Sequence, residues 1–436
     1  MGVQDILIAP LFLVFLYGVA YARRAKQVNP LTKKYYFIAL HLRFFGAFAL
    51  AMIYQFYYQG GDTYNFFHDS SIIWQALTTQ PEIGLQIISD TPGTLNPATQ
   101  AYTNYMYFYV DKQSMILIKT AALLGIPTYN TYLAIAFFFA FFSFTGVWAM
   151  YKAFVDMYPM LYRRMAFACL MIPAAFFWGS GLMKDTLIVG ALGWGVHSFY
   201  FGVIKRRNLL SNITVLVFSI WLMQAIKIYV AMSFLPAVAT WLLLNFRSSI
   251  RIGLLRALIL PIVLLASLPI AYVAVSQLTE GTRFSFEEIG ATTKTNTEWN
   301  AISGAASYSL GEYDGTIGSV ISKFPAAVFV SLFQPFLWQA RNPLMVLAAL
   351  QATFILFLTL QTFFKAGLKF FSIVINQPFF AFCLIFTIIL AFGTGVGSGN
   401  YGSLDRYRIP FIPFYVSMMY GVQYFARKPK KLRQLV

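Results

Sequence analysis

Apolar runs long enough to cross a membrane recur along the whole chain and limit what it can fold into. A hydrocarbon core about 30 Å thick is crossed by about 20 residues of α-helix, and hydropathy outlines about eleven such runs. Because a spanning segment must satisfy its own backbone hydrogen bonds, we expect an all-α polytopic membrane protein. The expected spans are 5–22, 36–57, 131–151, 165–182, 186–204, 209–226, 228–246, 255–277, 343–364, 373–393 and 408–426. The shorter apolar pieces 114–126 and 318–338 are expected to be re-entrant or interfacial.

Composition supports the same class. Charged residues make up 11% of the 436 residues, whereas soluble domains carry about 25%. Both cysteines, Cys169 and Cys383, fall inside apolar runs, so neither a disulfide framework nor a thiolate metal site is expected. The first run is followed by "RRAKQ" instead of a small-residue cleavage site, which predicts a retained helix. We expect residues 1–436 to form a single transmembrane domain.

The positive charges predict how the chain is oriented in the membrane. With eleven spans, the basic segments between and after them all fall on one side, which is therefore predicted to be cytoplasmic. The N-terminus then lies outside and the C-terminus inside. Of the fifteen Asp and Glu residues, all but Asp156 fall outside. The outer segments 57–113, 278–318 and 394–408 therefore carry most of the polar chemistry. Because the net charge of +17 is scattered over short loops, it does not indicate a nucleic-acid partner.

Candidate catalytic residues lie in the first outer segment, "QGGDTYNFFHDSS". If "DTYNFFHDSSIIWQAL" is a helix, Asp62 and Asp69 share one face, at positions i and i+7. Asp62 would then be a general base for an acceptor hydroxyl, and Asp69 or His68 would orient it. The alternative is that Asp62 caps the helix while Asp69 and His68 are solvated. Glu287 and Glu288, in the second outer segment, are further candidates for the base.

Basic residues on the predicted outer side oppose the usual charge bias and indicate a phosphate site. Lys184 follows the Gly-Ser-Gly break in "FFWGSGLMKD", where a helix start would also favour an anion. Arg406 and Arg408 lie in "GNYGSLDRYRIPF", and on an extended segment they would face the same way and grip a phosphate. The further candidates are Lys227 and Arg341. The alternatives are a tight interfacial turn around Lys184, a snorkelling Lys227 and arginines that anchor the interface.

Some classes of site are absent from the sequence. It contains no Walker loop, no HExxH zinc motif and no paired histidines for haem or di-metal chemistry. A nucleotide-driven pump and a histidine-rich redox centre are therefore not expected.

Three short motifs resemble a known family. The aspartate in the first large outer loop, the many spans with broken helices and the late "DRYRIPFIPF" are similar to the GT-C superfamily of membrane glycosyltransferases. The "FFWGSGLMKD" turn also resembles segments of bacterial surface-polysaccharide polymerases. The GT-C resemblance implies transfer of a sugar from a polyprenyl-phosphate donor to a glycan, lipid or protein acceptor on the outer face of a bacterial inner membrane. It places the base on Asp62, the second acid on Asp69, and the phosphate contacts on Arg406, Arg408 and Lys184.

Departures from the GT-C pattern leave other functions open, and one of them is an extra N-terminal span that places the N-terminus outside. The chain has "GGD" in place of an adjacent Asp-Glu pair, so the need for a divalent cation is undecided, and no large soluble domain follows the last span. A polymerase or ligase of lipid-linked polysaccharide would use the arginines on a pyrophosphate without needing Asp62. A lipid or glycan transporter would place charges near the bilayer midplane and repeat its halves. A non-catalytic scaffold of the cell envelope is the fourth candidate.

Overall fold

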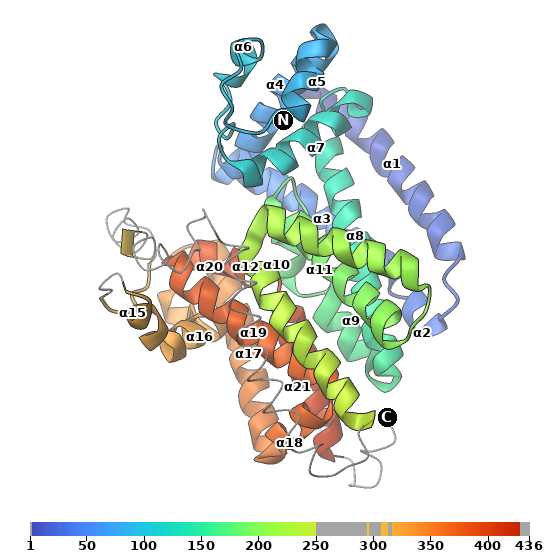
Figure 1. Cartoon of the computed structure of the whole chain (residues 1–436), viewed down its shortest axis with the longest axis vertical. Coiled ribbons are helices and arrows are strands. Elements are labelled where there is room, and N and C mark those ends of the chain that lie inside the picture. The colour runs from blue at the N-terminus through green and yellow to red at the C-terminus, as the bar shows by residue number, and fades with distance from the viewer. Residues whose placement is uncertain (1, 250–293, 296–306, 313–315, 428–436) are drawn as a thin grey trace. The chain divides into compact units, whose positions relative to one another are not determined.

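The computed structural model describes residues 2–249, 294–295, 307–312 and 316–427 (Figure 1). These residues form helices, and the one pairing of extended backbone among them is an isolated bridge between Ser307 and Asn400. The expected span 255–277 and the candidate acids Glu287 and Glu288 lie outside the described residues.

Seven helices within the described residues are long and apolar enough to cross a membrane. This confirms the expected class of helical membrane protein, whereas the number of eleven spans is not confirmed. The seven candidate spans are Val3–Ala25, Pro30–Tyr57, Tyr132–Met157, Lys184–Ile204, Leu209–Phe246, Pro343–Ala366 and Pro378–Ser398.

Besides the expected span 373–393, which is divided between α18 (Lys369–Asn376) and α19 (Pro378–Ser398), two of the expected spans differ from the helices observed. The expected span 165–182 is divided into α9 (Tyr162–Leu170) and α10 (Pro173–Trp178). Pro173 forces the residue before it away from the helical region, and Ile172 accordingly has ψ 122°. The expected span 408–426 is shortened to α21 (Ile412–Arg427), because residues 408–411 form a turn between this helix and α20 (Tyr401–Tyr407).

A further difference lies at Lys227. The expected spans 209–226 and 228–246 form one long element, α12 (Leu209–Ser249), whose backbone leaves the helical region at this residue (φ −143°, ψ 81°). At 1.5 Å per residue the 41 residues would measure about 60 Å as one straight helix, roughly twice a hydrocarbon core. The two halves of α12 are therefore separate helical segments that meet at Lys227, as the sequence predicts.

The described chain divides into two compact units. Unit 1 comprises Met1–Tyr162 and Leu170–Lys227, and unit 2 comprises Arg163–Cys169 and Ile228–Val436. Besides α10 and the first part of α12, unit 1 contains α1 (Val3–Ala25), α2 (Pro30–Lys33), α3 (Tyr36–Met52), η1 (Ile53–Tyr57), α4 (Asp62–Thr79), α5 (Pro81–Ser89), α6 (Gln100–Thr103), α7 (Lys112–Thr128), α8 (Tyr132–Met157), η2 (Pro159–Leu161), α11 (Lys184–Ser198) and η3 (Phe199–Ile204).

Helices α8 and α11 form the centre of unit 1 and pack with their backbones in close approach. A Cβ added at Gly146 of α8 would lie 2.0 Å from the carbonyl oxygen of Gly190, and one at Gly193 would lie 2.2 Å from that of Gly146. Small residues at helix interfaces permit this approach in membranes, where apolar burial drives helix association only weakly. The glycines therefore fix how α8 and α11 pack together.

Contacts along α8 give unit 1 two distinct ends. At one end, the Asp5 carboxylate accepts a hydrogen bond from the Leu133 amide, so α1 and α8 begin together. At the other end, the Trp148 indole donates to Gln27, just after α1 ends. Helix α3 runs the opposite way, because its first residue, Tyr36, packs on Trp148 with ring centroids 4.9 Å apart. These relative directions are those that the predicted alternation of spans requires.

We call these the α4 end and the α2 end. The α4 end holds the starts of α1, α8 and α11 together with α4 and α7, and the α2 end holds the starts of α3 and α12 and the last turns of α1, α8 and α11 (Figure 1).

The three longest helices of unit 2 after residue 316 are α17, α19 and α21. Gln423 of α21 donates to Thr362 of α17, and Ser331 of α16 donates to the carbonyl oxygen of Ala391 in α19. The helices after the gap are α15 (Ile317–Ser322), α16 (Phe324–Phe333), η4 (Leu337–Gln339), α17 (Pro343–Ala366), α18 (Lys369–Asn376), α19 (Pro378–Ser398), α20 and α21.

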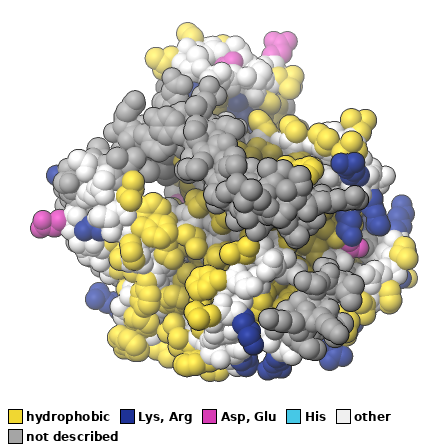
Figure 2. All heavy atoms as spheres, turned by 60° about the horizontal axis from the view of Figure 1, so that its bottom comes forward, with side chains coloured by type: hydrophobic (Ala, Val, Ile, Leu, Met, Phe, Trp, Pro, Cys, Tyr) yellow, Lys and Arg dark blue, Asp and Glu magenta, His cyan; other side chains and the backbone are white. Residues whose placement is uncertain are grey.

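Large hydrophobic side chains cover much of the exposed surface. Ile6 and Val14 of α1 are 75% and 70% exposed, and Phe364 of α17 is 89% exposed. On the face shown in Figure 2, hydrophobic side chains form broad areas beside small groups of Lys and Arg. Apolar surface of this extent suits a lipid environment.

Candidate functional site

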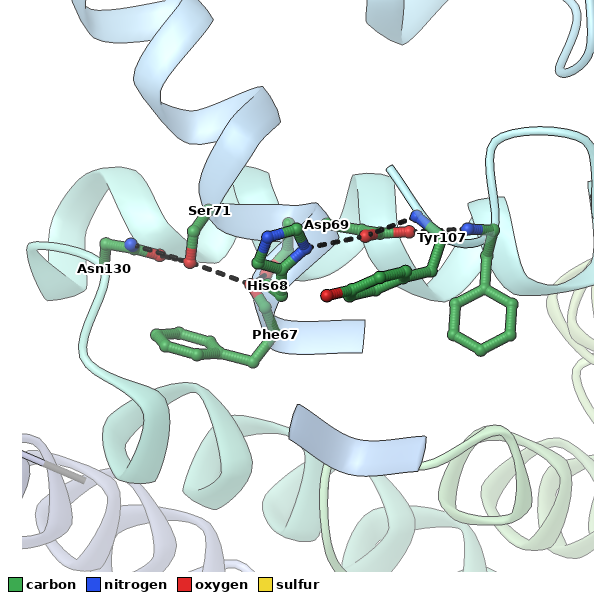
Figure 3. A network of polar contacts seen from close by, with 8 residues as sticks. Phe67, His68, Asp69, Ser71, Tyr107 and Asn130 are labelled. Atoms are coloured by element: carbon green, nitrogen blue, oxygen red, sulfur yellow. Dashed lines mark hydrogen bonds and ion pairs between the residues drawn. The ribbon is translucent and has the colours of Figure 1, made fainter. Parts of the chain in front are cut away.

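Asp69 lies buried on α4 and holds a distant loop against that helix. Its two carboxylate oxygens accept hydrogen bonds from the amides of Tyr107 (3.0 Å) and Phe108 (2.8 Å). His68 lies beside it, with Nδ1 3.1 Å from the same carboxylate and its ring against Tyr107 (Figure 3). The expected alternative of a solvated Asp69 is wrong, because this side chain is fully buried. Its contacts make Asp69 an anchor for residues 107–108.

Asp62 begins α4 and is half-buried. The N-cap before it is Gly61, whose φ of +107° belongs to the region that favours glycine. A Cβ at Gly61 would also lie 3.0 Å from the Tyr54 ring. The glycine pair in "GGD" thus turns the chain sharply and presents Asp62 in the first helical turn, where the helix dipole favours a carboxylate. The helix begins where the sequence predicts, with Gly61 as the cap in place of Asp62.

Lys184 begins α11 and joins it to the loop held by Asp69. Its Nζ lies 3.2 Å from the Asp111 carboxylate and 5.9 Å from the centre of the Phe66 ring. Phe66 lies one helical turn after Asp62 and packs on Phe108, with ring centroids 5.0 Å apart. Lys184 therefore lies against the first two turns of α4.

Asp111 is the N-cap residue of α7 and binds three partners. Its carboxylate accepts hydrogen bonds from the Gln113 amide (3.0 Å) and the Ser114 hydroxyl (2.5 Å) in addition to Lys184. Partial burial alone would raise the pKa of this carboxyl, but the hydrogen bond from Ser114 and the Lys184 charge outweigh burial and hold the pKa below its usual value. Asp111 is thus an anion at neutral pH that fixes Lys184 over α4.

Lys227 and Asp185 form a buried ion pair beside this cluster. The Lys227 ammonium, 7% exposed, bonds to the Asp185 carboxylate, which is fully buried. Lys227 can reach Asp185 at the point where α12 leaves helical geometry. Neighbouring residues of a helix point about 100° apart, so the adjacent Lys184 and Asp185 form ion pairs with different partners, Asp111 and Lys227.

The structure thus brings several predicted residues to the α4 end of unit 1. We call the following set the α4-end cluster: Asp62, Asp111, Lys184, Asp185 and Lys227. The sequence did not single out Asp111 or pair Asp185 with Lys227. Asp111 had a local signal, because aspartate is a favoured N-cap residue at the start of a helix. The Asp185 partner lies 42 residues away and had none.

The predicted arginines belong to unit 2 and lie in different environments. Residues 401–407 are helical, so the expected extended segment with two arginines on one side is wrong. Arg408 is fully buried, forms an ion pair with Asp405 to which its Nε donates a hydrogen bond (3.1 Å), and donates through Nη1 to the carbonyl oxygen of Gln334 (3.0 Å). Arg406 is half-buried beside the Tyr407 ring, and Arg341 is exposed before α17. These bonds give Arg408 a place in the packing of unit 2.

No metal-binding group of three or more His, Cys, Asp or Glu side chains occurs in the part of the chain that the structure describes. Comparison with protein-family models, curated proteins and solved structures finds no match to this chain. Function is therefore argued from the residues of the site.

Proposed function

We propose that this protein is a membrane glycosyltransferase that moves a sugar from a polyprenyl-phosphate donor to an acceptor at the α4 end of unit 1. In the predicted orientation, this end faces the outer side of a bacterial inner membrane. The proposal joins the GT-C resemblance of the sequence to the charges that the fold gathers there.

The observation that carries the proposal is the approach of Lys184 to the first turns of α4. Lys184 Nζ lies 5.9 Å from the centre of the buried Phe66 ring, and Phe66 lies one helical turn after Asp62, so an ammonium from α11 and a carboxylate from α4 belong to the same end of unit 1. Group transfer from a phosphate needs this combination, a base near the nucleophile and a cation near the leaving group.

The reaction assigns one task to each residue. Asp62 takes the proton of the acceptor hydroxyl as its oxygen bonds to the anomeric carbon of the donor sugar. The bond between that carbon and the phosphate oxygen breaks, and the phosphate leaves with the electron pair. Lys184 stabilises the negative charge that develops on the phosphate. Asp111 holds Lys184 in place until the donor phosphate binds.

Asp69 and His68 have a positioning part in this proposal. Asp69 binds two backbone amides with its carboxylate oxygens, so it orders the loop that carries Asp111. The arginines of unit 2 are separate candidates for phosphate contacts, and Arg406 is the more accessible of the pair in the "DRYRIP" motif.

The buried Lys227–Asp185 pair favours a second candidate, an ion-coupled transporter of lipid or glycan. Ionisable residues buried in membrane helices mark ion or proton paths, and breaks in such helices line binding sites. In a transporter, Lys227→Met would abolish substrate movement, and no sugar-phosphate bond would be cleaved. A polymerase or ligase would instead cleave a diphosphate-linked donor and tolerate Asp62→Asn.

The test uses the full-length chain in nanodiscs with a panel of polyprenyl-phosphate hexoses and, separately, a polyprenyl-diphosphate oligosaccharide. Released polyprenyl phosphate is measured, because this product does not depend on knowing the acceptor, and an E. coli lipid and glycan extract supplies acceptors. We expect Asp62→Asn to lower turnover at least about a hundredfold, the usual contribution of a general base. Lys184→Ala should lower it comparably, while Lys184→Arg retains part of it.

Glu82→Gln is the matched control, because Glu82 is an exposed acid in the first turn of α5 within the same loop. This variant should keep full turnover. Full activity of both Asp62→Asn and Lys184→Ala would refute the proposal. Release from only the diphosphate donor, unaffected by Asp62→Asn, would establish the polymerase or ligase instead.

A further inference from the structure

A second polar site occupies the α2 end of unit 1, opposite the α4-end cluster. It is a pocket of about 580 Å³ between the last turns of α1 and α11, residues 144–152 of α8, and the starts of α3 and α12. Lys152 lies about 30 Å along α8 from Tyr132, the first residue of that helix, so this pocket lies well away from the α4 end.

Cations and aromatic rings line this pocket together. Arg23 and Lys26 enter it from the end of α1, and Lys152 enters it from α8. Trp148 and Trp194 supply large aromatic surfaces, with Trp148 held by a hydrogen bond to Gln27. Among the described residues that line the pocket, none is acidic.

The charges in the pocket are not compensated by acids of the described residues. Asp156, the acid nearest in sequence to Lys152, bonds instead to the Tyr200 hydroxyl (2.8 Å) and lies 3.8 Å from Lys205. No ion pair joins Arg23, Lys26 or Lys152 to any acid that the structure describes. Arg23 and Lys152 are close enough for their charges to repel each other. Like charges gathered in a half-enclosed pocket favour an anion between them.

The surroundings of the pocket indicate that this anion belongs to an amphiphile. Val14 of α1 and Val217 of α12 project from the same two helices and are 70% and 60% exposed. Trp221, a turn further along α12, is 52% exposed. Acyl chains can lie on apolar side chains of this kind while a headgroup enters the pocket.

We propose that the α2-end pocket binds the phosphate headgroup of an anionic membrane lipid, between Arg23, Lys26 and Lys152. The site is separate from the α4-end cluster and does not depend on the proposed glycosyltransferase activity. Asn212 and Ser198, which also line the pocket, offer neutral hydrogen-bonding groups to the rest of the headgroup. In the predicted orientation, the lipid comes from the cytoplasmic leaflet.

The test measures binding to the purified full-length chain by native mass spectrometry in detergent. Three probes separate the parts of the ligand: dioctanoyl phosphatidic acid, dioctanoylglycerol without the phosphate, and glycerol 3-phosphate without the acyl chains. We expect one saturable copy of phosphatidic acid, with each of the other two probes at least about tenfold weaker. Arg23→Gln with Lys152→Gln should weaken phosphatidic acid binding about tenfold or more, because charge-assisted contacts are lost.

The matched control is Lys205→Gln with Arg206→Gln, which removes the same charge from exposed residues of this end that do not line the pocket. It should change binding less than about twofold. Equal weakening by both double variants would overturn the pocket in favour of general surface attraction. Equal binding of glycerol 3-phosphate would overturn the lipid and leave a soluble phosphate.

Two further variants keep the test decisive if the pocket double variant does not fold. Lys152→Arg retains the charge and should retain binding, whereas Lys26→Gln changes an exposed side chain and should weaken binding about threefold. Unchanged binding by folded Lys26→Gln together with loss in Lys152→Arg would contradict a role for charge.

Discussion

The two ends of unit 1 use their lysines in opposite ways. At the α4 end, Lys184 is joined to Asp111 and Lys227 to Asp185. At the α2 end, Lys152 has no acidic partner among the described residues and faces a pocket with other cations. A buried lysine with an acid of its own stabilises the fold, and removing one partner leaves a buried charge. A lysine that shares a pocket with other cations is suited to a ligand that brings the negative charge.

The largest expected effect comes from breaking the buried pair at the α4 end. Lys227→Met leaves the Asp185 carboxylate buried without its cation, and we expect the free energy of unfolding to fall by about 3–5 kcal/mol. This destabilisation is measured by heating the protein in detergent and recording the loss of its monomer peak in size-exclusion chromatography. Lys227→Met with Asp185→Leu should recover most of the loss, because no buried charge remains.

Lys152→Met is the corresponding change at the α2 end. It removes a cation without leaving an acid unpaired, so the thermal midpoint should stay the same or rise slightly. A loss as large as that of Lys227→Met would break the distinction between the two ends.

The next largest effect is expected at the contact between Gly146 of α8 and Gly190 of α11, the two helices that connect both ends of unit 1. Gly146→Ala places a methyl group 2.0 Å from the carbonyl oxygen of Gly190, so α8 and α11 must separate. We expect a loss of about 1–3 kcal/mol in the same unfolding measurement. Gly393→Ala, at an exposed position of α19 with no atom within 4 Å of the added methyl group, is the control and should not destabilise the protein.

A smaller and local effect is expected at Asp69. Asp69→Asn removes the negative charge that two backbone amides share and turns one acceptor into a donor, which costs about 1–3 kcal/mol. Hydrogen exchange at the amides of Tyr107 and Phe108 should accelerate about tenfold or more, with little change in α8. His68→Ala should leave exchange at Phe108 nearly unchanged. Unaltered exchange in Asp69→Asn would show that the loop is held by other contacts.

The smallest effect concerns the pH dependence of the Lys184–Asp111 pair. Because the pKa of Asp111 lies below its ordinary value of 3.8, its carboxylate stabilises the fold above pH 3.8. That contribution is lost as the pH falls through the lower pKa of the folded state. Asp111→Asn should lower the thermal midpoint by about 2 °C at pH 7, since half-exposed pairs contribute little. The difference from the unchanged protein should shrink as the pH falls below 3.8, and a constant difference would show that charge is not its cause.

Several features of the fold follow from local sequence. Helix α4 begins at Asp62 because two glycines allow the turn before it, and Lys227 separates two apolar runs just where the backbone leaves the helix. The expected span 165–182 was too long because the conformational effect of Pro173 on Ile172 divides it. The pair Arg406 and Arg408 was placed on an extended segment, although Asn400 caps a helix there by accepting from the Ser403 amide.

The sequence by itself determined that the chain is a helical membrane protein and located most of its long apolar helices. Those properties depend on residues within one turn or one span of each other, and backbone hydrogen bonding in lipid leaves few other choices. Tertiary structure alone decided which charges meet. Lys184 and Asp111 lie 73 residues apart, and the cations of the α2-end pocket come from α1 and α8. Partners at such separations are chosen by helix packing, so only the fold distinguishes a lysine that holds the structure together from one that faces a ligand pocket.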